Sequence, residues 1–346
     1  MPIFPLGKER IAITLGDPAG IGPEVTLKAL QCLKKNSPAK ILLLGPAAFY
    51  HDLAEKLKLK ILFKNLAAFS EWKDGLPFIP CYFEEALPKK ILLGASNNLL
   101  TTRAVRSIEL AVYLAMQNAI DAIVTPPINK AGLKKAGFSM PGHTEYLADL
   151  SRTKRYEMML VGGGLRVALV TRHIPLKDVS RNISFKRVEE TILLTDQELR
   201  RSFGFRRPRI VVCGLNPHAG EQGNLGMEED LQIAPALRSA RKKTNAEITG
   251  PLSPDTLFYD AVKGDYDAEV CMYHDQGLIP LKMISRGSGV NVTLGLPFVR
   301  TSPDHGTGYD IAPAFAADPG SMVEAIRLAC LIFQNRRKYA RAHSRS

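Results

Sequence analysis

The chain has 346 residues, of which 45% are hydrophobic, enough for one large or two medium globular domains with substantial cores. No apolar run approaches the roughly 20 residues that span a bilayer. The amino terminus lacks a signal-peptide pattern, so we expect a cytoplasmic protein and no membrane partner. The net charge is +12, yet aromatic residues are not interleaved with the basic ones, so nucleic acid is not an expected partner. The five cysteines are scattered without a Cys-x-x-Cys, which argues against a disulfide framework.

The first elements in chain order predict a strand, a glycine-rich loop and a helix. Residues 11–15 form an apolar run, residues 16–22 contain three glycines, and Pro23 opens a helix through about residue 33. The loop could hold a phosphate at the helix N-terminus, or it could be a tight βα turn. It matches neither common nucleotide fingerprint, so the sequence leaves both interpretations open.

The following stretch continues the alternation. We expect strands at residues 40–45, 56–64 and 122–124, and a helix at 103–119. The last of these strands ends in polar residues, from Thr125 to Lys130. Residues 66–98 carry no pattern that we can assign.

The second half of the chain predicts a hairpin and further alternating elements. Expected strands are 158–161, 166–170, 210–212, 268–273 and 290–294, and expected helices are 143–150, 184–203, 228–242 and one from about 321. The fold class is therefore α/β, with mixed, mostly parallel sheets flanked by helices.

Three histidines, His173, His218 and His274, each follow a strand-like run. Open α/β sheets bind ligands at the carboxyl ends of their strands, so these imidazoles could converge on one metal ion with a position left for substrate. Each could instead be an ordinary hydrogen-bonded histidine. Asp255, Asp275 and Glu221 are candidate carboxylates for orienting the imidazoles, or they are turn and cap residues.

A second group of residues has the chemistry to bind an anion. His143 and Thr144 stand at the start of an expected helix, and Lys282, Asn291 and Arg300 lie further along the chain. Together they could bind a phosphorylated or carboxylated small molecule. Surface basic residues are common, so spacing alone does not decide between a binding site and solvated side chains.

The chain closely resembles the 4-hydroxythreonine-4-phosphate dehydrogenase family. The motifs that carry the resemblance keep the family's order over nearly the whole chain, at residues 13–24, 141–145, 171–176, 214–221, 250–258, 273–277 and 291–300. The resemblance implies NAD- or NADP-dependent oxidation of 4-(phosphooxy)-L-threonine to a 3-keto acid. That acid loses CO2 to give 3-amino-2-oxopropyl phosphate, in the biosynthesis of pyridoxal 5'-phosphate.

The resemblance also implies roles for residues. It assigns a divalent metal ion (Zn, Co or Mg) to His173, His218 and His274, with ligands from both subunits of a homodimer that share the active site. It assigns the substrate to a further set: His143, Thr144, Lys282, Asn291 and Arg300. For the catalytic base, Asp275 and Lys282 are the candidates.

A more distant similarity links residues 304–312 to the cofactor loop of the isocitrate and isopropylmalate dehydrogenases. It implies that His305, Gly306, Thr307 and Asp310 line the dinucleotide. It further implies their two-domain fold, with residues 1–125 plus 295–346 in one domain and 126–294 in the other. The second domain would carry most metal and substrate residues, and the active site would lie in the cleft and at the dimer interface. Pro313 and Pro126 depart from the patterns of these loops.

Two other functions compete with this one. A family member could oxidise another phosphorylated hydroxy acid or a cis-dihydrodiol. More remotely, the chain could be a non-catalytic metal- or nucleotide-binding protein, which would not reduce a nicotinamide.

Overall fold

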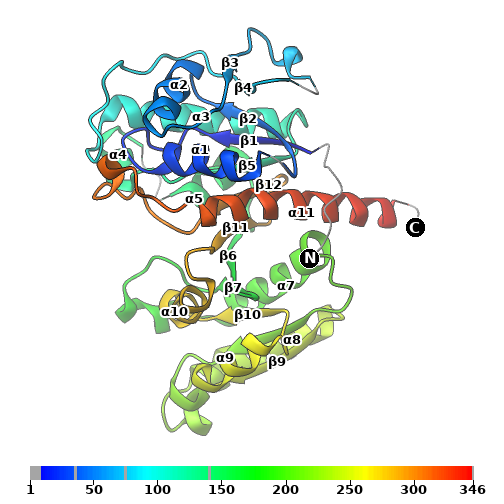
Figure 1. Ribbon diagram of the computed structural model, residues 1–346. Helices are drawn as coiled ribbons and strands as arrows, with labels where there is room; N and C mark the ends of the chain where they lie inside the picture. Colours follow the sequence, from blue (N-terminus) through cyan, green and yellow to red (C-terminus); the bar gives the residue numbers. More distant parts are fainter. Residues whose placement is uncertain (1–8, 35–36, 74–75, 139–141, 345–346) are drawn as a thin grey trace. The chain divides into compact units, whose positions relative to one another are not determined.

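The computed structural model describes residues 9–34, 37–73, 76–138 and 142–344, so Pro141 of the motif at 141–145 lies outside them. The chain forms two compact units (Figure 1). Unit 1 comprises Met1–Thr153 and Leu296–Phe333, and unit 2 comprises Lys154–Gly295 and Gln334–Ser346.

Unit 1 is built on a parallel sheet with the strand order β3-β4-β2-β1-β5-β12. The strands are β1 (Arg10–Thr14), β2 (Lys40–Leu44), β3 (Phe63–Asn65), β4 (Ile79–Cys81), β5 (Ala122–Val124) and β12 (Val299–Pro303). The helices are α1 (Gly22–Leu33), α2 (Ala47–Lys56), α3 (Asn98–Met116), α4 (Lys130–Lys135), α5 (His143–Leu150) and most of α11 (Gly320–His343). The central strands are apolar on both faces and almost wholly buried, as expected where helices cover a parallel sheet on both sides.

Unit 2 is built on a mixed sheet with the order β11-β6-β7-β10-β8-β9. The strands are β6 (Glu157–Gly162), β7 (Leu165–Leu169), β8 (Arg209–Cys213), β9 (Glu247–Leu252), β10 (Ala268–Cys271) and β11 (Val290–Leu294). The helices are α6 (Val179–Asn182), α7 (Phe185–Phe203), α8 (Ala234–Lys243), α9 (Pro254–Lys263) and α10 (His274–Ser285). Only β6 runs against its neighbours, so the adjacent strands β7, β10, β8 and β9 all point the same way.

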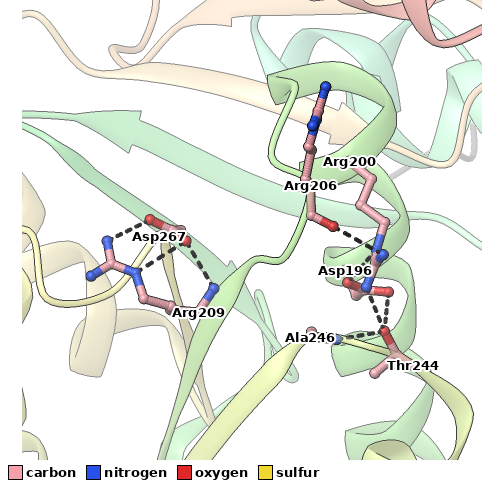
Figure 2. A network of polar contacts seen from close by, with 7 residues as sticks. All are labelled: Asp196, Arg200, Arg206, Arg209, Thr244, Ala246 and Asp267. Atoms are coloured by element: carbon pink, nitrogen blue, oxygen red, sulfur yellow. Dashed lines mark hydrogen bonds and ion pairs between the residues drawn. The ribbon is translucent and has the colours of Figure 1, made fainter.

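Many basic residues of unit 2 are used inside its own fold. Figure 2 shows Arg209 paired with Asp267 through its side chain, with an Nη2–Oδ1 distance of 2.8 Å, and Arg200 paired with Asp196 at 2.9 Å. Thr244 bridges the second pair, because its hydroxyl donates to Asp196 and accepts from Arg200. Part of the positive charge is therefore matched by local carboxylates.

The expected α/β class is confirmed, as are the hairpin of β6 and β7 and the helix that begins after Ser184. The strand expected at residues 56–64 is wrong, because α2 extends to Lys56 and only Phe63–Asn65 are extended. Helix α10 was not expected; it begins at His274, shortly after β10. No helix in the described part of the chain is long and apolar enough to cross a membrane.

The division into units differs from the expected domains at two places. Gln334–Ser346 belong to unit 2 instead of to the domain with the amino terminus. The break falls after Thr153 instead of after residue 125. The reason lies in α5, whose Tyr146 hydroxyl donates to Glu109 of α3 at 2.6 Å and whose apolar residues are buried. Residues 126–153 are therefore part of unit 1.

Candidate functional site

The three predicted metal ligands of unit 2 follow neighbouring strands. His173 comes after β7, His274 after β10 and His218 after β8. These strands are adjacent and parallel, so their carboxyl ends meet at one edge of the sheet. The fold of unit 2 thus gathers the three histidine-bearing loops at a single edge, where open α/β sheets bind ligands.

Two of the imidazoles are in contact. The rings of His173 and His274 have centroids 5.4 Å apart and planes inclined at 46°. Nδ1 of His274 lies 2.6 Å from Oδ1 of Asp275. A carboxylate that hydrogen-bonds one ring nitrogen fixes the orientation of the imidazole and leaves the other nitrogen for a ligand. The two imidazoles are therefore close together, and one of them is oriented by a carboxylate.

His218 lies on a loop of unusual backbone geometry. His218, Ala219, Glu221 and Gln222 all have positive φ angles, between 45° and 56°. Non-glycine residues in this region cost on the order of 1 kcal/mol or more each, and such strain persists only where the surroundings impose it. Here the exposed imidazole of His218 is held away from the core.

Buried Glu229 anchors the start of this loop. Its Oε1 accepts from the backbone N–H groups of Leu215 and Asn216, both at 2.7 Å, and its Oε2 accepts from Asn216 Nδ2 at 2.9 Å. Sequence reasoning missed Glu229, because an acidic residue at the start of a helix is the usual pattern there. Within the described residues of one chain, no group of three His, Cys, Asp or Glu side chains is close enough to hold a metal ion.

Arg300 is the central cation of unit 1. It is 2% exposed, and its Nε and Nη2 donate to Thr125 Oγ1 at 3.0 and 2.7 Å. Burial lowers the pKa of the guanidinium to about 9, although the Glu145 carboxylate acts in the opposite direction. A buried guanidinium can form charge-assisted, bidentate hydrogen bonds with a phosphate or a carboxylate.

His143 stands beside this cation at the first turn of α5. Its Nε2 is buried and has no hydrogen-bond partner within the described residues. Burial, followed by the charges of Arg300 and Lys130, lowers the pKa of the imidazole well below its ordinary value. The ring is therefore neutral at physiological pH, and Thr144 next to it is also buried.

Lys130 belongs to the same group but was not predicted. A Cβ placed on Gly142 would lie 3.9 Å from its Nζ, so Lys130 reaches the start of α5. The only available signal was the polar run from Thr125 to Lys130 at a strand end. Unit 1 thus brings together Arg300, His143 and Lys130, which can receive a phosphate or a carboxylate.

The predicted cofactor loop packs against the glycine loop. Ile21 N–H donates to the carbonyl of Thr307 at 2.9 Å, and the Tyr309 hydroxyl donates to Asp17. A Cβ on Gly20 would lie 2.6 Å from the Thr307 carbonyl oxygen, so only glycine permits this approach. The glycine loop therefore acts as a tight βα turn that supports residues 304–310.

The predicted cofactor residues themselves are accessible in different degrees. Gly306 and Asp310 are exposed. His305 is half-buried, with Nδ1 3.0 Å from the carbonyl oxygen of Gly306 and with a buried Nε2 that has no partner in the described part of the chain. A pocket of about 180 Å³ adjoins this region and is lined by residues that include Pro18, Gly20 and Ala312.

The remaining predicted residues lie on unit 2. Lys282 is exposed near the end of α10, on the same helix as His274 and Asp275, and Asn291 is half-buried in β11. Asp275 is largely exposed, with 71% of its side chain accessible. Each unit therefore carries its own part of the predicted set.

Comparison with known proteins gives a consistent result. The family model "Pyridoxal phosphate biosynthetic protein PdxA" matches residues 39–329. A 4-hydroxythreonine-4-phosphate dehydrogenase of Desulfosudis oleivorans is 45% identical over 329 residues, covering 92% of this chain and 94% of the relative. A crystal structure of the enzyme of that name from Klebsiella pneumoniae has a TM-score of 0.83 and 40% identity, covering 94% of this chain and all of that chain. A protein of Oceanobacillus iheyensis, provisionally named a D-threonate 4-phosphate dehydrogenase, is 40% identical over 93% of this chain and 97% of its own length.

Proposed function

This chain belongs to the pyridoxal phosphate biosynthetic protein PdxA family, and we propose that it oxidises 4-(phosphooxy)-L-threonine with a nicotinamide cofactor. The product, a 3-keto acid, would lose CO2 to give 3-amino-2-oxopropyl phosphate. The observation that carries the proposal is the group in unit 1 formed by two cations, Arg300 and Lys130, with the neutral imidazole of His143 between their charges. The phosphate and carboxylate of a phosphorylated hydroxy acid are anions of the kind that such a group recognises.

The substrate residues act by electrostatics and orientation. Thr125 accepts two hydrogen bonds from Arg300, so the guanidinium is oriented before substrate arrives. His143 is neutral, so its imidazole N–H can donate a hydrogen bond to an anion without transferring a proton to it. On the family resemblance, Thr144, Lys282 and Asn291 complete the substrate contacts.

A divalent metal ion, Zn, Co or Mg, fits the imidazole pair of unit 2. We assign it to His173 and His274, supported by their 5.4 Å centroid separation and by the Asp275 contact that orients His274. His218 from a second copy of the chain would be the third ligand, since no cluster of three potential ligands exists among the described residues of one copy. A bound divalent metal lowers the pKa of a hydroxyl and stabilises developing oxyanions.

Hydride transfer requires NAD or NADP, for which His305, Gly306, Thr307 and Asp310 are the proposed contacts. The support is the packing of this loop on the glycine loop and the adjoining pocket. Of the two candidate bases, Asp275 already hydrogen-bonds His274, a contact that suits an orienting role. Lys282 is therefore the stronger candidate for removing the hydroxyl proton.

A homodimer fits the surface of α10. Ile279 and Met283 on this helix are 58% and 73% exposed, and the same helix begins with His274. Apolar side chains beside a metal ligand are well placed to be covered by a second copy that shares the site. Cytoplasmic location stays a prediction.

Two substrate classes compete with the proposed one. The relative named for D-threonate 4-phosphate makes another phosphorylated hydroxy acid a specific alternative. A cis-dihydrodiol carries no phosphate, so it offers no phosphate for Arg300 and Lys130 to bind.

A substrate panel tests the proposal. The purified protein, loaded with a divalent metal, should reduce NAD or NADP fastest with 4-(phosphooxy)-L-threonine, and CO2 should be released in equal amount. Efficient turnover of D-threonate 4-phosphate or of a dihydrodiol, with none of the phosphothreonine, would refute the assignment.

The variant His218→Ala tests the metal ligands separately. We expect it to lose bound metal, measured by elemental analysis, and to lose turnover while unfolding cooperatively, because His218 is exposed and supports no core contact. Full activity of the variant after chelation would show that this histidine holds no essential metal.

A further inference from the structure

Unit 2 has a cationic pocket that the proposed reaction does not use. It measures about 360 Å³ and is bordered by five basic side chains: Lys154, Arg155, Arg172, Lys186 and Arg187. Two carboxylates, Glu157 and Glu190, also line it. Five cations against two carboxylates leave a surplus of three positive charges, and none of these residues belongs to the predicted substrate, metal or cofactor sets.

The topology of unit 2 concentrates this charge. β6 is antiparallel to β7, so the start of β6, with the preceding Lys154 and Arg155, lies beside the segment that follows the end of β7, with Arg172. Lys186 and Arg187 enter from the first turn of α7. Three segments distant in sequence thus place basic groups around one hollow.

The start of α7 adds positive charge beside the pocket, although Ser184 Oγ accepts from the Arg187 N–H and Gln232 Oε1 accepts from the Phe185 N–H. The N-terminus of a helix carries a partial positive charge and favours acidic residues, yet the first turn of α7 holds Lys186 and Arg187 and no acidic residue. The 19-residue helix α7 therefore directs its positive end and two cations at the same pocket. An anion there would relieve both sources of repulsion.

The carboxylates do not cancel this charge. Oε2 of Glu157 is buried without a hydrogen-bond partner among the described residues, and burial raises the pKa of this carboxyl to about 7 in spite of Arg172 and Arg187. Near neutral pH, Glu157 is therefore only partly ionised. Glu190 is 4.0 Å from Lys186, an exposed pair that contributes little.

One of the cations is held in place by an aromatic ring. The guanidinium of Arg172 lies 5.0 Å from the centroid of the Tyr156 ring, a cation–π distance. A guanidinium fixed in this way loses less side-chain entropy when it binds a ligand. The pocket volume is at the lower end of the range for small-molecule sites, which suits a compact ligand.

We propose that this pocket binds a small anion carrying at least two phosphate groups. The surplus charge, the positive end of α7 and the pocket volume together match a pyrophosphate-type group, free or as part of a larger metabolite. None of the residues that line this pocket is among those proposed to bind the phosphorylated substrate.

Calorimetric titration of the full chain with inorganic pyrophosphate tests the proposal. The double variant Lys186→Gln/Arg187→Gln should bind at least tenfold more weakly than the unaltered protein. The matched control, Arg207→Gln/Lys242→Gln, removes the same number of charges from exposed positions outside the pocket and should stay within about twofold.

The contradicting outcomes are distinct. An equal loss of pyrophosphate affinity in both double variants would mean that binding depends only on the net charge of the protein. Unchanged affinity in the pocket variant would mean that pyrophosphate binds elsewhere. Either result, or no measurable binding to the unaltered protein at low ionic strength, overturns the proposal. Cooperative unfolding of both variants would be verified first.

Discussion

Replacing Thr125 by valine removes a hydroxyl that accepts two hydrogen bonds from Arg300, while keeping the shape of the side chain. Two N–H groups of a guanidinium that is 2% exposed donate to this one hydroxyl. Hydrogen bonds to charged groups contribute about 1.5 to 3 kcal/mol each, and a buried donor left without an acceptor costs a similar amount. Because the two bonds share one oxygen, we expect Thr125→Val to lower the free energy of unfolding by about 3 kcal/mol.

The matched control is Thr125→Ser, which keeps the hydroxyl and removes one methyl group. Urea denaturation of both variants should show a clear midpoint shift for valine and about 1 kcal/mol or less for serine. In activity assays the valine variant should raise KM for the phosphorylated substrate more than it lowers kcat, because Arg300 loses its orientation before binding. Equal stability and equal KM in the two variants would refute the role given to the Thr125–Arg300 contact.

Three further predictions rest on single contacts. Because burial lowers the pKa of Arg300 to about 9, kcat/KM should fall as pH rises through about 9, and a flat profile between about pH 8 and pH 10 would contradict its role as the anion-binding cation. Burial raises the pKa of Glu269 from 4.5 to about 7, so ionisation of this carboxyl destabilises the folded state as pH rises through that window. Glu269→Gln should therefore raise the free energy of unfolding at pH 8 by up to about 3 kcal/mol, seen as a higher melting temperature, and should change it little at pH 4. Gly20→Ala should weaken nicotinamide binding and lower the melting temperature, since its methyl group would lie 2.6 Å from the Thr307 carbonyl, whereas Gly306→Ala meets no atom within 4 Å and should keep the melting temperature unchanged.

Local patterns predicted several elements well. The hairpin of β6 and β7 follows from two apolar runs joined by glycines, and α7 follows from Ser184 and the helical spacing behind it. The expected strand at 56–64 was wrong because alternating Lys and Leu residues also suit the end of a helix and an irregular connection. The missed helix α10 contains Pro280 and begins in the middle of a motif, so its helical pattern is weak.

The sequence by itself determined the family, the α/β class and the placement of His173, His218 and His274 directly after buried strands, because each depends on residues close together in the chain. Only the tertiary structure decided that His173 contacts His274, that Glu229 holds the His218 loop, and that Lys130 and Arg300 flank His143. These contacts depend on which strands become neighbours. That order is set by pairings between distant segments, such as β7 with β10, which no local pattern specifies.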